Sequence, residues 1–329
     1  MLSVHRRTIY RIGLALGIGL FLYQAYSGYH AFSQLKTSPE LINTLLTTVV
    51  IAIGAFVLPT ITWGVLMRSE GTSLLWIEIL RGYPLSFIPR YIPGSIWGYL
   101  SRSEWLFEQA KMPYVKSMMV SFLEIWVVLV SGTTVILLHL VPIARTSNFL
   151  VQGAITFAFI LASWLFLRLI TQIPFIRTLV TRISSVDHLP KPGFGLYLLA
   201  VVMYGIMWFL YGFVLSGVLA IMGSQRFSYV PGTSANFAIS WMAGFLAIVI
   251  PSGLGVRELA LASLLSNFPK LSGAQIGASV VIMRFFVILG ELFWLGISQS
   301  IAFFSHRWVR SSSKGIKTAQ TPIDDDRAI

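Results

Sequence analysis

Five charged side chains stand within otherwise apolar stretches of the sequence: Glu124, Arg257, Glu258, Arg284 and Glu291. A charge near the centre of a bilayer costs about 2.5–3.5 kcal/mol even on a lenient insertion scale, so such residues usually pair or bind something. Arginine suits contact with a phosphate group, and buried glutamates suit charge balance or proton coupling. We therefore expect these residues to line one polar site.

The composition indicates a polytopic membrane protein. Of 329 residues, 56% are hydrophobic and 11% are charged, against roughly 25% charged residues in a soluble domain. A transmembrane helix needs about 20 apolar residues. Six stretches qualify: 10–29, 42–67, 114–141, 148–170, 194–222 and 273–304. The sequence has no cysteine and its histidines lack metal-ligand spacing, so we expect no metal or other cofactor.

The basic residues predict an orientation. With the N-terminus inside the cell, most of the 24 Lys and Arg residues fall on the cytoplasmic side, as in other multi-pass proteins. The sequence thus predicts an inner or plasma membrane protein with both termini cytoplasmic. The net charge of +12 then faces anionic headgroups, and we expect no nucleic-acid partner. Residues 1–305 would form one integral-membrane domain, and 306–329, first basic and then acidic, a disordered tail.

Two further apolar segments, 72–101 and 232–266, are broken by Pro and Gly. Six full spans already place both termini inside, so each broken segment must enter and leave on the same side. The predicted fold class is an all-α polytopic membrane protein with about six transmembrane helices plus two re-entrant helical hairpins. The hairpins enter from opposite faces, which predicts an inverted repeat with halves at about 42–141 and 194–304.

The two breaks carry residues that suit a phosphate. Irregular backbone at membrane depth is tolerated where it borders a polar cavity, and the start of the helix after each break offers free N–H groups to an anion. We expect the lipid phosphate site to combine these tips with two arginines: Gly94, Ser95, Ser252, Gly253, Gly255, Arg257 and Arg284.

The remaining charged residues have expected roles around that site. Glu124, Glu258 and Glu291 would balance charge or couple to protons. At the cytoplasmic mouth, Arg90 and Arg102 would gather headgroups. Trp97, just past the first tip, would pack against an acyl chain or seal the cavity.

Three strings of residues resemble one known family. They are Ile92-Pro93-Gly94-Ser95-Ile96-Trp97 with the following Arg102, then Ser121-Phe122-Leu123-Glu124, then Phe245 to Glu258. In this order they resemble the flippase-like transmembrane region of lysylphosphatidylglycerol synthases, the family that includes the multiple peptide resistance factor. The likeness covers about residues 10–305, and its most specific part is Gly253-Leu254-Gly255-Val256-Arg257-Glu258. Ser252 stands where many relatives carry Gly.

The resemblance implies a membrane region that moves an aminoacylated phospholipid between leaflets. In the family, a separate soluble domain C-terminal to that region makes the lipid. This sequence ends soon after its last predicted span, so we expect no aminoacyl transfer and no enzyme activity. We expect a lipid transporter for a membrane phospholipid or a polyprenyl-phosphate-linked lipid. The lipid's identity, homo-oligomerisation and functional pairing with a separate lipid-modifying enzyme stay open.

Other functional classes also stay open. A membrane-embedded glycosyltransferase with a polyprenyl-phosphate donor would typically carry acids on its first external loop, where Glu40 is the only one. A small-anion channel or an assembly-promoting subunit is the other alternative. Lipid flux, sugar incorporation and electrical conductance distinguish these classes.

Overall fold

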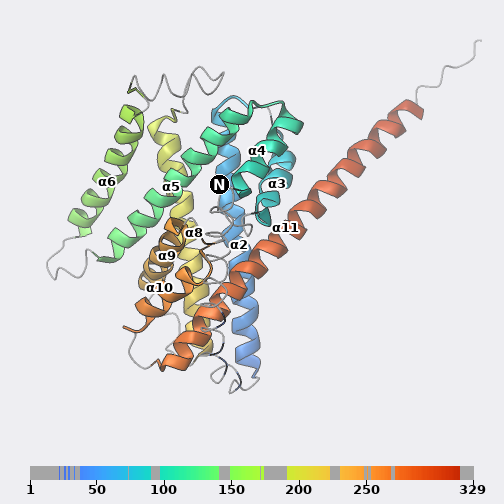
Figure 1. Ribbon diagram of the computed structural model, residues 1–329. Helices are drawn as coiled ribbons and strands as arrows, with labels where there is room; N and C mark the ends of the chain where they lie inside the picture. The colour runs from blue at the N-terminus through green and yellow to red at the C-terminus, as the bar shows by residue number, and fades with distance from the viewer. Residues whose placement is uncertain are drawn as a thin grey trace, which may run out of the picture.

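The structure is a computed structural model of the chain, and all of its described regular elements are helical (Figure 1). It describes residues 38–72, 74–89, 97–140, 149–170, 172–173, 191–222, 230–247, 250, 253–267 and 271–318, with Leu22, Tyr26, Tyr29 and Ser33.

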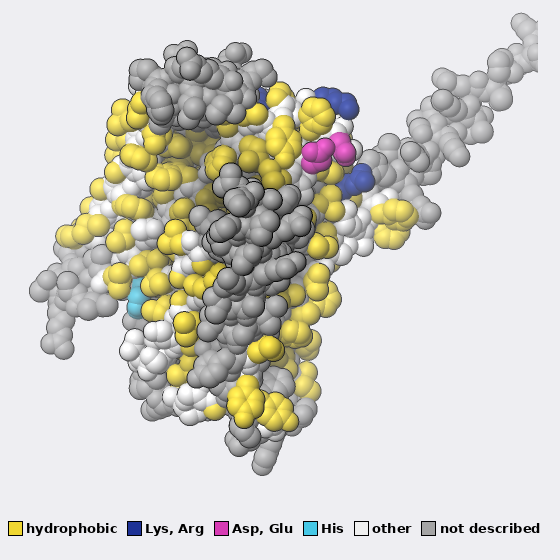
Figure 2. Space-filling view, viewed as in Figure 1, with side chains coloured by type: hydrophobic (Ala, Val, Ile, Leu, Met, Phe, Trp, Pro, Cys, Tyr) yellow, Lys and Arg dark blue, Asp and Glu magenta, His cyan; other side chains and the backbone are white. Residues whose placement is uncertain are grey.

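Five helices in the described part of the chain are long and apolar enough to cross a membrane. They are α2 (Pro39–Ser69), α5 (Tyr114–Leu140), α6 (Phe149–Ile170), α8 (Phe194–Ile221) and α11 (Gly273–Thr318). They confirm five of the six predicted spans to within a few residues, and the predicted span 10–29 lies almost wholly outside the described residues. Hydrophobic side chains cover much of the flank in Figure 2, while Lys, Arg and acidic side chains gather near its upper end. The fold is that of an all-helical, multi-pass membrane protein.

Local sequence sets several helix boundaries. The Ser38 hydroxyl accepts a hydrogen bond from the Leu41 N–H at 3.1 Å, and Pro39 occupies the first helical position, where its missing N–H costs nothing. Further along α2, Pro59 lies inside the helix. The apolar part of α11 ends at Ser305, but the helix continues to Thr318, so the predicted disordered tail begins as helix. No proline interrupts that stretch, and adding residues to an existing helix is far easier than starting one.

Both broken segments form short helices separated by breaks. The first contains α3 (Trp76–Gly82), a short 3₁₀ helix η1 (Pro84–Ser86) and α4 (Trp97–Ala110). The second contains α9 (Val230–Leu246) and α10 (Val256–Leu265). In Figure 1, α3 and α4 lie toward the upper end, where α2 ends and α5 begins, whereas α9 and α10 lie in the lower half. In this view the segments therefore lie in opposite halves of the bundle.

The two halves of the chain pack against each other. Helices α2 and α8 lie side by side at the centre. Helix α11 packs against α2 and α3 of the first half, and α5 packs against α8 and α9 of the second. Within the halves, α4 rests on α5 and α10 on α11, while α6 lies at the side and touches α5 and α8. This packing directs both broken segments toward the same interior.

Candidate functional site

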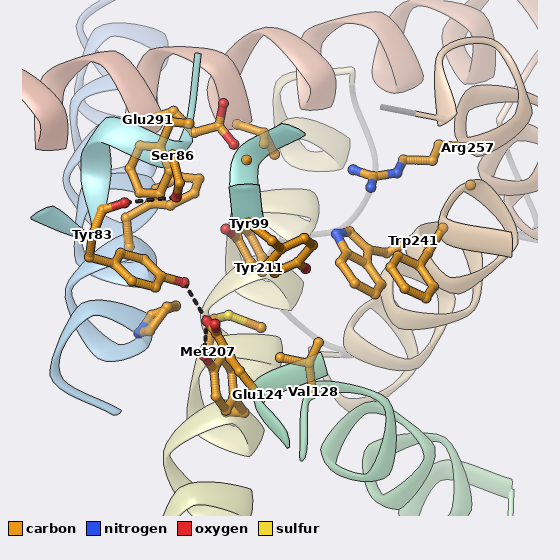
Figure 3. Close-up of a pocket in the computed structure, with 18 of the residues that line it drawn as sticks. Tyr83, Ser86, Tyr99, Glu124, Val128, Met207, Tyr211, Trp241, Arg257 and Glu291 are labelled. Atoms are coloured by element: carbon orange, nitrogen blue, oxygen red, sulfur yellow. Dashed lines mark hydrogen bonds between the residues drawn. The ribbon is translucent and has the colours of Figure 1, made fainter. Parts of the chain in front are cut away.

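A cavity of about 130 Å³ lies among the central helices, with room for several water molecules or one compact polar group. Its charged lining residues are Arg102, Glu124, Arg257, Arg284 and Glu291. Aromatic rings form much of the remaining wall: Phe56, Tyr83, Phe87, Tyr99, Tyr204, Tyr211, Phe237, Trp241 and Phe245. Figure 3 shows several of them converging from different helices, including Tyr99, Glu124, Trp241, Arg257 and Glu291. Four of the five charged residues that the sequence singled out, namely Glu124, Arg257, Arg284 and Glu291, line this cavity, and Glu258 is not among its lining residues.

Glu124 on α5 is the hub of a hydrogen-bond network. Its Oε2 accepts a hydrogen bond from Arg102 of α4 at 2.5 Å. Its Oε1 accepts hydrogen bonds from the Tyr83 hydroxyl at 3.0 Å and the Tyr204 hydroxyl at 2.8 Å (Figure 3). The side chains of Arg102 and Glu124 are 2% and 5% exposed. One buried carboxylate therefore joins α4, α5, α8 and the turn after α3.

Arg102 lies in a different place from the one predicted. The sequence suggested a guanidinium at the cytoplasmic mouth, but the side chain is buried beside Glu124. The rings of Trp63, Tyr83 and Tyr99 surround it, with centroids 5.2, 4.8 and 5.2 Å from its Cζ. A carboxylate and aromatic faces compensate an arginine that leaves water. Arg90 lies outside the described residues, and for Trp97 only the helical backbone is described.

The second acid–base pair joins α10 to α11. Glu258 Oε1 lies 3.6 Å from Arg284 Nη1, and both side chains are buried. The other oxygen, Oε2, accepts a hydrogen bond from the Gly255 N–H at 2.5 Å. Glu258 thus places a negative charge at the positive end of α10. The predicted phosphate contact at Gly255 is therefore taken by the chain's own carboxylate.

Backbone geometry at the second break requires glycine. Gly253 and Gly255 have φ angles of +63° and +84°, which residues with a Cβ rarely adopt. Helix α10 begins at Val256 with Gly255 as its cap residue. Ser252 and the first tip, Gly94 and Ser95, lie outside the described residues.

Arg257 and Glu291 complete the charged lining. The Arg257 guanidinium lies over the Trp241 ring, 5.2 Å from its centroid, and points toward the middle of the cavity in Figure 3. Glu291 reaches the cavity from α11 and is 5% exposed. It shares a helix face with Arg284, two turns earlier, and both line the cavity. Arginines therefore face the cavity from both halves of the chain.

The sequence singled out none of the aromatic and small residues that line this cavity, among them Tyr83, Tyr204, Trp241 and Gly244. Aromatic residues and glycines are common in membrane helices, so type alone did not distinguish them. Tyr204 offered one signal, because it lies in the middle of the 194–222 span and tyrosine prefers the membrane interface. Among the described residues, no group of His or acidic side chains has the arrangement of a metal site.

Comparison with known proteins identifies a family for most of the chain. No curated protein matches the chain. Residues 9–292 match the family described as the lysylphosphatidylglycerol synthase TM region. That match extends from the predicted first span through Glu291 and includes both broken segments. The chain therefore belongs to the lysylphosphatidylglycerol synthase TM region family.

Proposed function

We propose that the protein transports an anionic phospholipid or a polyprenyl-phosphate-linked lipid between leaflets, without catalysing a reaction. Its family connects it with membrane lipids. The observation that carries the proposal is a small cavity lined by Arg102, Arg257 and Arg284 inside an otherwise apolar helical bundle. Arginine is the side chain best suited to bind a phosphate through two parallel hydrogen bonds.

The size of the cavity supports a headgroup as the occupant. Pockets that enclose a whole drug-sized molecule measure about 300–1,000 Å³, whereas this one measures about 130 Å³. A phosphate with a short polar substituent suits that space, and two acyl chains do not. The acyl chains would remain in the surrounding lipid while the headgroup crosses the protein.

The packing supports the finer topology of the proposal. Each half contributes a long helix, a broken segment and a second long helix, and the pattern of contacts in one half recurs in the other. We infer six transmembrane helices, with the broken segments re-entering from opposite faces and both termini cytoplasmic. Two half-membrane segments that meet at one internal site are a common basis of alternating access. Arg257 and Arg284 would hold the phosphate, while Glu258 and Glu291 balance the charge.

The test is translocation of a labelled phospholipid in proteoliposomes containing the purified protein. Arg257→Ala should abolish protein-dependent translocation, because it removes a cation from the cavity, and should leave the protein folded. Arg168→Ala is a matched control. Arg168 also lies over a tryptophan, with its Cζ 4.8 Å from the Trp164 ring centroid, but it is on α6 and is absent from the cavity lining.

The outcome separates the competing functions. Wild-type translocation in the Arg257→Ala variant would refute the assigned site. Labelled anionic phospholipid and labelled polyprenyl phosphate, tested separately, distinguish the two substrate classes. Sugar incorporation without lipid flux would identify a glycosyltransferase, and anion conductance in a planar bilayer without lipid flux would identify a channel.

A further inference from the structure

Arg257 reaches the cavity along an unusual path. Its side chain crosses the last turn of α9 at Gly244, where a methyl group added to the glycine would lie 2.7 Å from Arg257 Nε and 2.9 Å from Cδ, and closer still to Cγ. Atoms in ordinary van der Waals contact are about 3.5–4.0 Å apart. The arginine side chain therefore lies directly on the glycine backbone, in the space that any other residue would fill.

The same turn of α9 also supports the guanidinium. Trp241, three residues before Gly244, lies beneath the Arg257 guanidinium. Phe245 stacks against that indole with an interplanar angle of 5° and a centroid distance of 5.3 Å. The orientation of the Trp241 ring is thus fixed by a neighbour on its own helix. The aliphatic part of Arg257 and its charged end are both held by residues 241–245.

We propose that Gly244 is a positioning residue for Arg257, and that Gly244 and Trp241 together hold the guanidinium toward the transported headgroup. This inference rests on the proposed function, because the importance of the guanidinium's position depends on headgroup binding. Gly244 itself need not contact the lipid. Its contribution is the absence of a side chain.

The neighbouring Gly253 has a different role. A methyl group added there would lie 2.5 Å from the Gly244 Cα and 2.6 Å from its carbonyl oxygen, so Gly253→Ala would have to move backbone. Gly244→Ala instead meets only the Arg257 side chain among its three nearest atoms. A side chain can rotate away at lower cost than two helices can separate. Gly244→Ala should therefore displace the arginine while leaving the fold in place.

A double-mutant cycle tests the proposal with the full-length protein in proteoliposomes. Gly244→Ala should reduce translocation of labelled anionic phospholipid by roughly tenfold to a hundredfold, the range expected when a binding group moves by about 1 Å. In the Arg257→Ala background, Gly244→Ala should cause no further loss, since the affected side chain is already gone. Gly205→Ala on α8, where an added methyl would meet nothing within 4 Å, should translocate like the wild type.

Thermal unfolding in detergent gives a second measurement that does not depend on transport. Gly244→Ala should lower the unfolding midpoint in the wild-type background and leave it unchanged in the Arg257→Ala background. Wild-type translocation by Gly244→Ala, or an equal midpoint loss in both backgrounds, would overturn the positioning role. A third outcome separates the two proposals. If even the unmutated protein translocates no lipid, but Gly244→Ala lowers the unfolding midpoint only when Arg257 is present, the proposed transport function fails and the contact of Gly244 with Arg257 is still confirmed.

Discussion

Each broken segment carries a charged residue that pairs with the following long helix, but the positions of the arginine and the glutamate are exchanged between the two halves. In the first half, the arginine is on the short helix and the glutamate on the following long one, as Arg102 of α4 and Glu124 of α5. In the second half, Glu258 is on the short helix α10 and Arg284 on the long helix α11. Each pair joins the end of a broken segment to the next long helix. The two pairs differ in the distance between their charged groups and in the number of hydrogen bonds that the carboxylate accepts.

The two pairs differ in the hydrogen bonds that their carboxylates accept. Glu124 has three donors, namely Arg102 and two tyrosine hydroxyls, so both oxygens of its carboxylate accept hydrogen bonds. The second pair is 3.6 Å apart, beyond a good hydrogen-bond distance, and the carboxylate instead caps its own helix. A third arginine, Arg257, enters the cavity beside it. The first pair therefore fixes α4 to α5 through several hydrogen bonds, whereas the Glu258–Arg284 pair is the longer of the two.

The largest expected effect concerns the sides from which the segments enter. The sequence contains no cysteine, so one introduced cysteine reports a single position. Glu108 near the end of α4 and Asn267 just after α10 are both exposed. In sealed right-side-out vesicles, a membrane-impermeant maleimide should label Asn267→Cys directly and Glu108→Cys after permeabilisation alone. Labelling of both variants from one side would refute the opposite entry of the two segments.

Breaking the first pair should cause the larger loss of stability. Arg102→Ala leaves Glu124 buried and without its cation, and breaking a buried ion pair in this way costs about 3–5 kcal/mol. The unfolding midpoint in detergent should fall accordingly. Arg81→Ala, which removes an exposed arginine on α3, is the control and should change stability by no more than about 0.5 kcal/mol. Similar midpoints for the two variants would show that the first pair does not fix α4.

Breaking the second pair should have a smaller effect on stability. Glu258→Gln keeps an oxygen that accepts the Gly255 N–H, but it removes the negative charge that lies at the start of α10 and faces the buried Arg284 at 3.6 Å. The charge–dipole contact alone contributes about 0.3–1 kcal/mol. Because the Glu258–Arg284 pair is longer than the Arg102–Glu124 pair and the glutamine retains the helix-cap hydrogen bond, the unfolding midpoint should drop less than in Arg102→Ala. A drop as large as that of Arg102→Ala, measured under the same conditions, would contradict the view that the Arg102–Glu124 pair contributes more to stability than the Glu258–Arg284 pair.

The sequence predicted the spans well because a bilayer imposes a simple requirement. Runs such as 194–222 and 273–304 contain enough apolar residues to cross it. The structure places α8 at nearly the first limits, and the apolar part of α11 ends at Ser305. The same reasoning identified Glu124, Glu258, Arg284 and Glu291 as charges at membrane depth, where each is costly, but it did not identify the buried Arg102. It also found the break between α9 and α10, which lies at the prolines and glycines of the second segment.

The partners of those charges could not be predicted from sequence. Arg102 is 22 positions from Glu124, and Tyr204 is 80 positions from it. No periodicity of one helix links such residues, because their proximity depends on how separate helices pack. For the same reason, the sequence assigned Arg102 to the cytoplasmic mouth. The contact between Gly244 and Arg257 was equally hidden, since a glycine gives no sign of which side chain will cross it.

The sequence by itself determined that this chain is a membrane protein, where its described helices cross, and which charges need an explanation. These properties follow from transfer of residues into an apolar solvent, which acts on each segment separately. The tertiary structure decided which arginine is paired with which glutamate, and which arginine lies on a glycine and points into the cavity. Those outcomes depend on distances of a few ångströms between helices, and only the packed bundle fixes them.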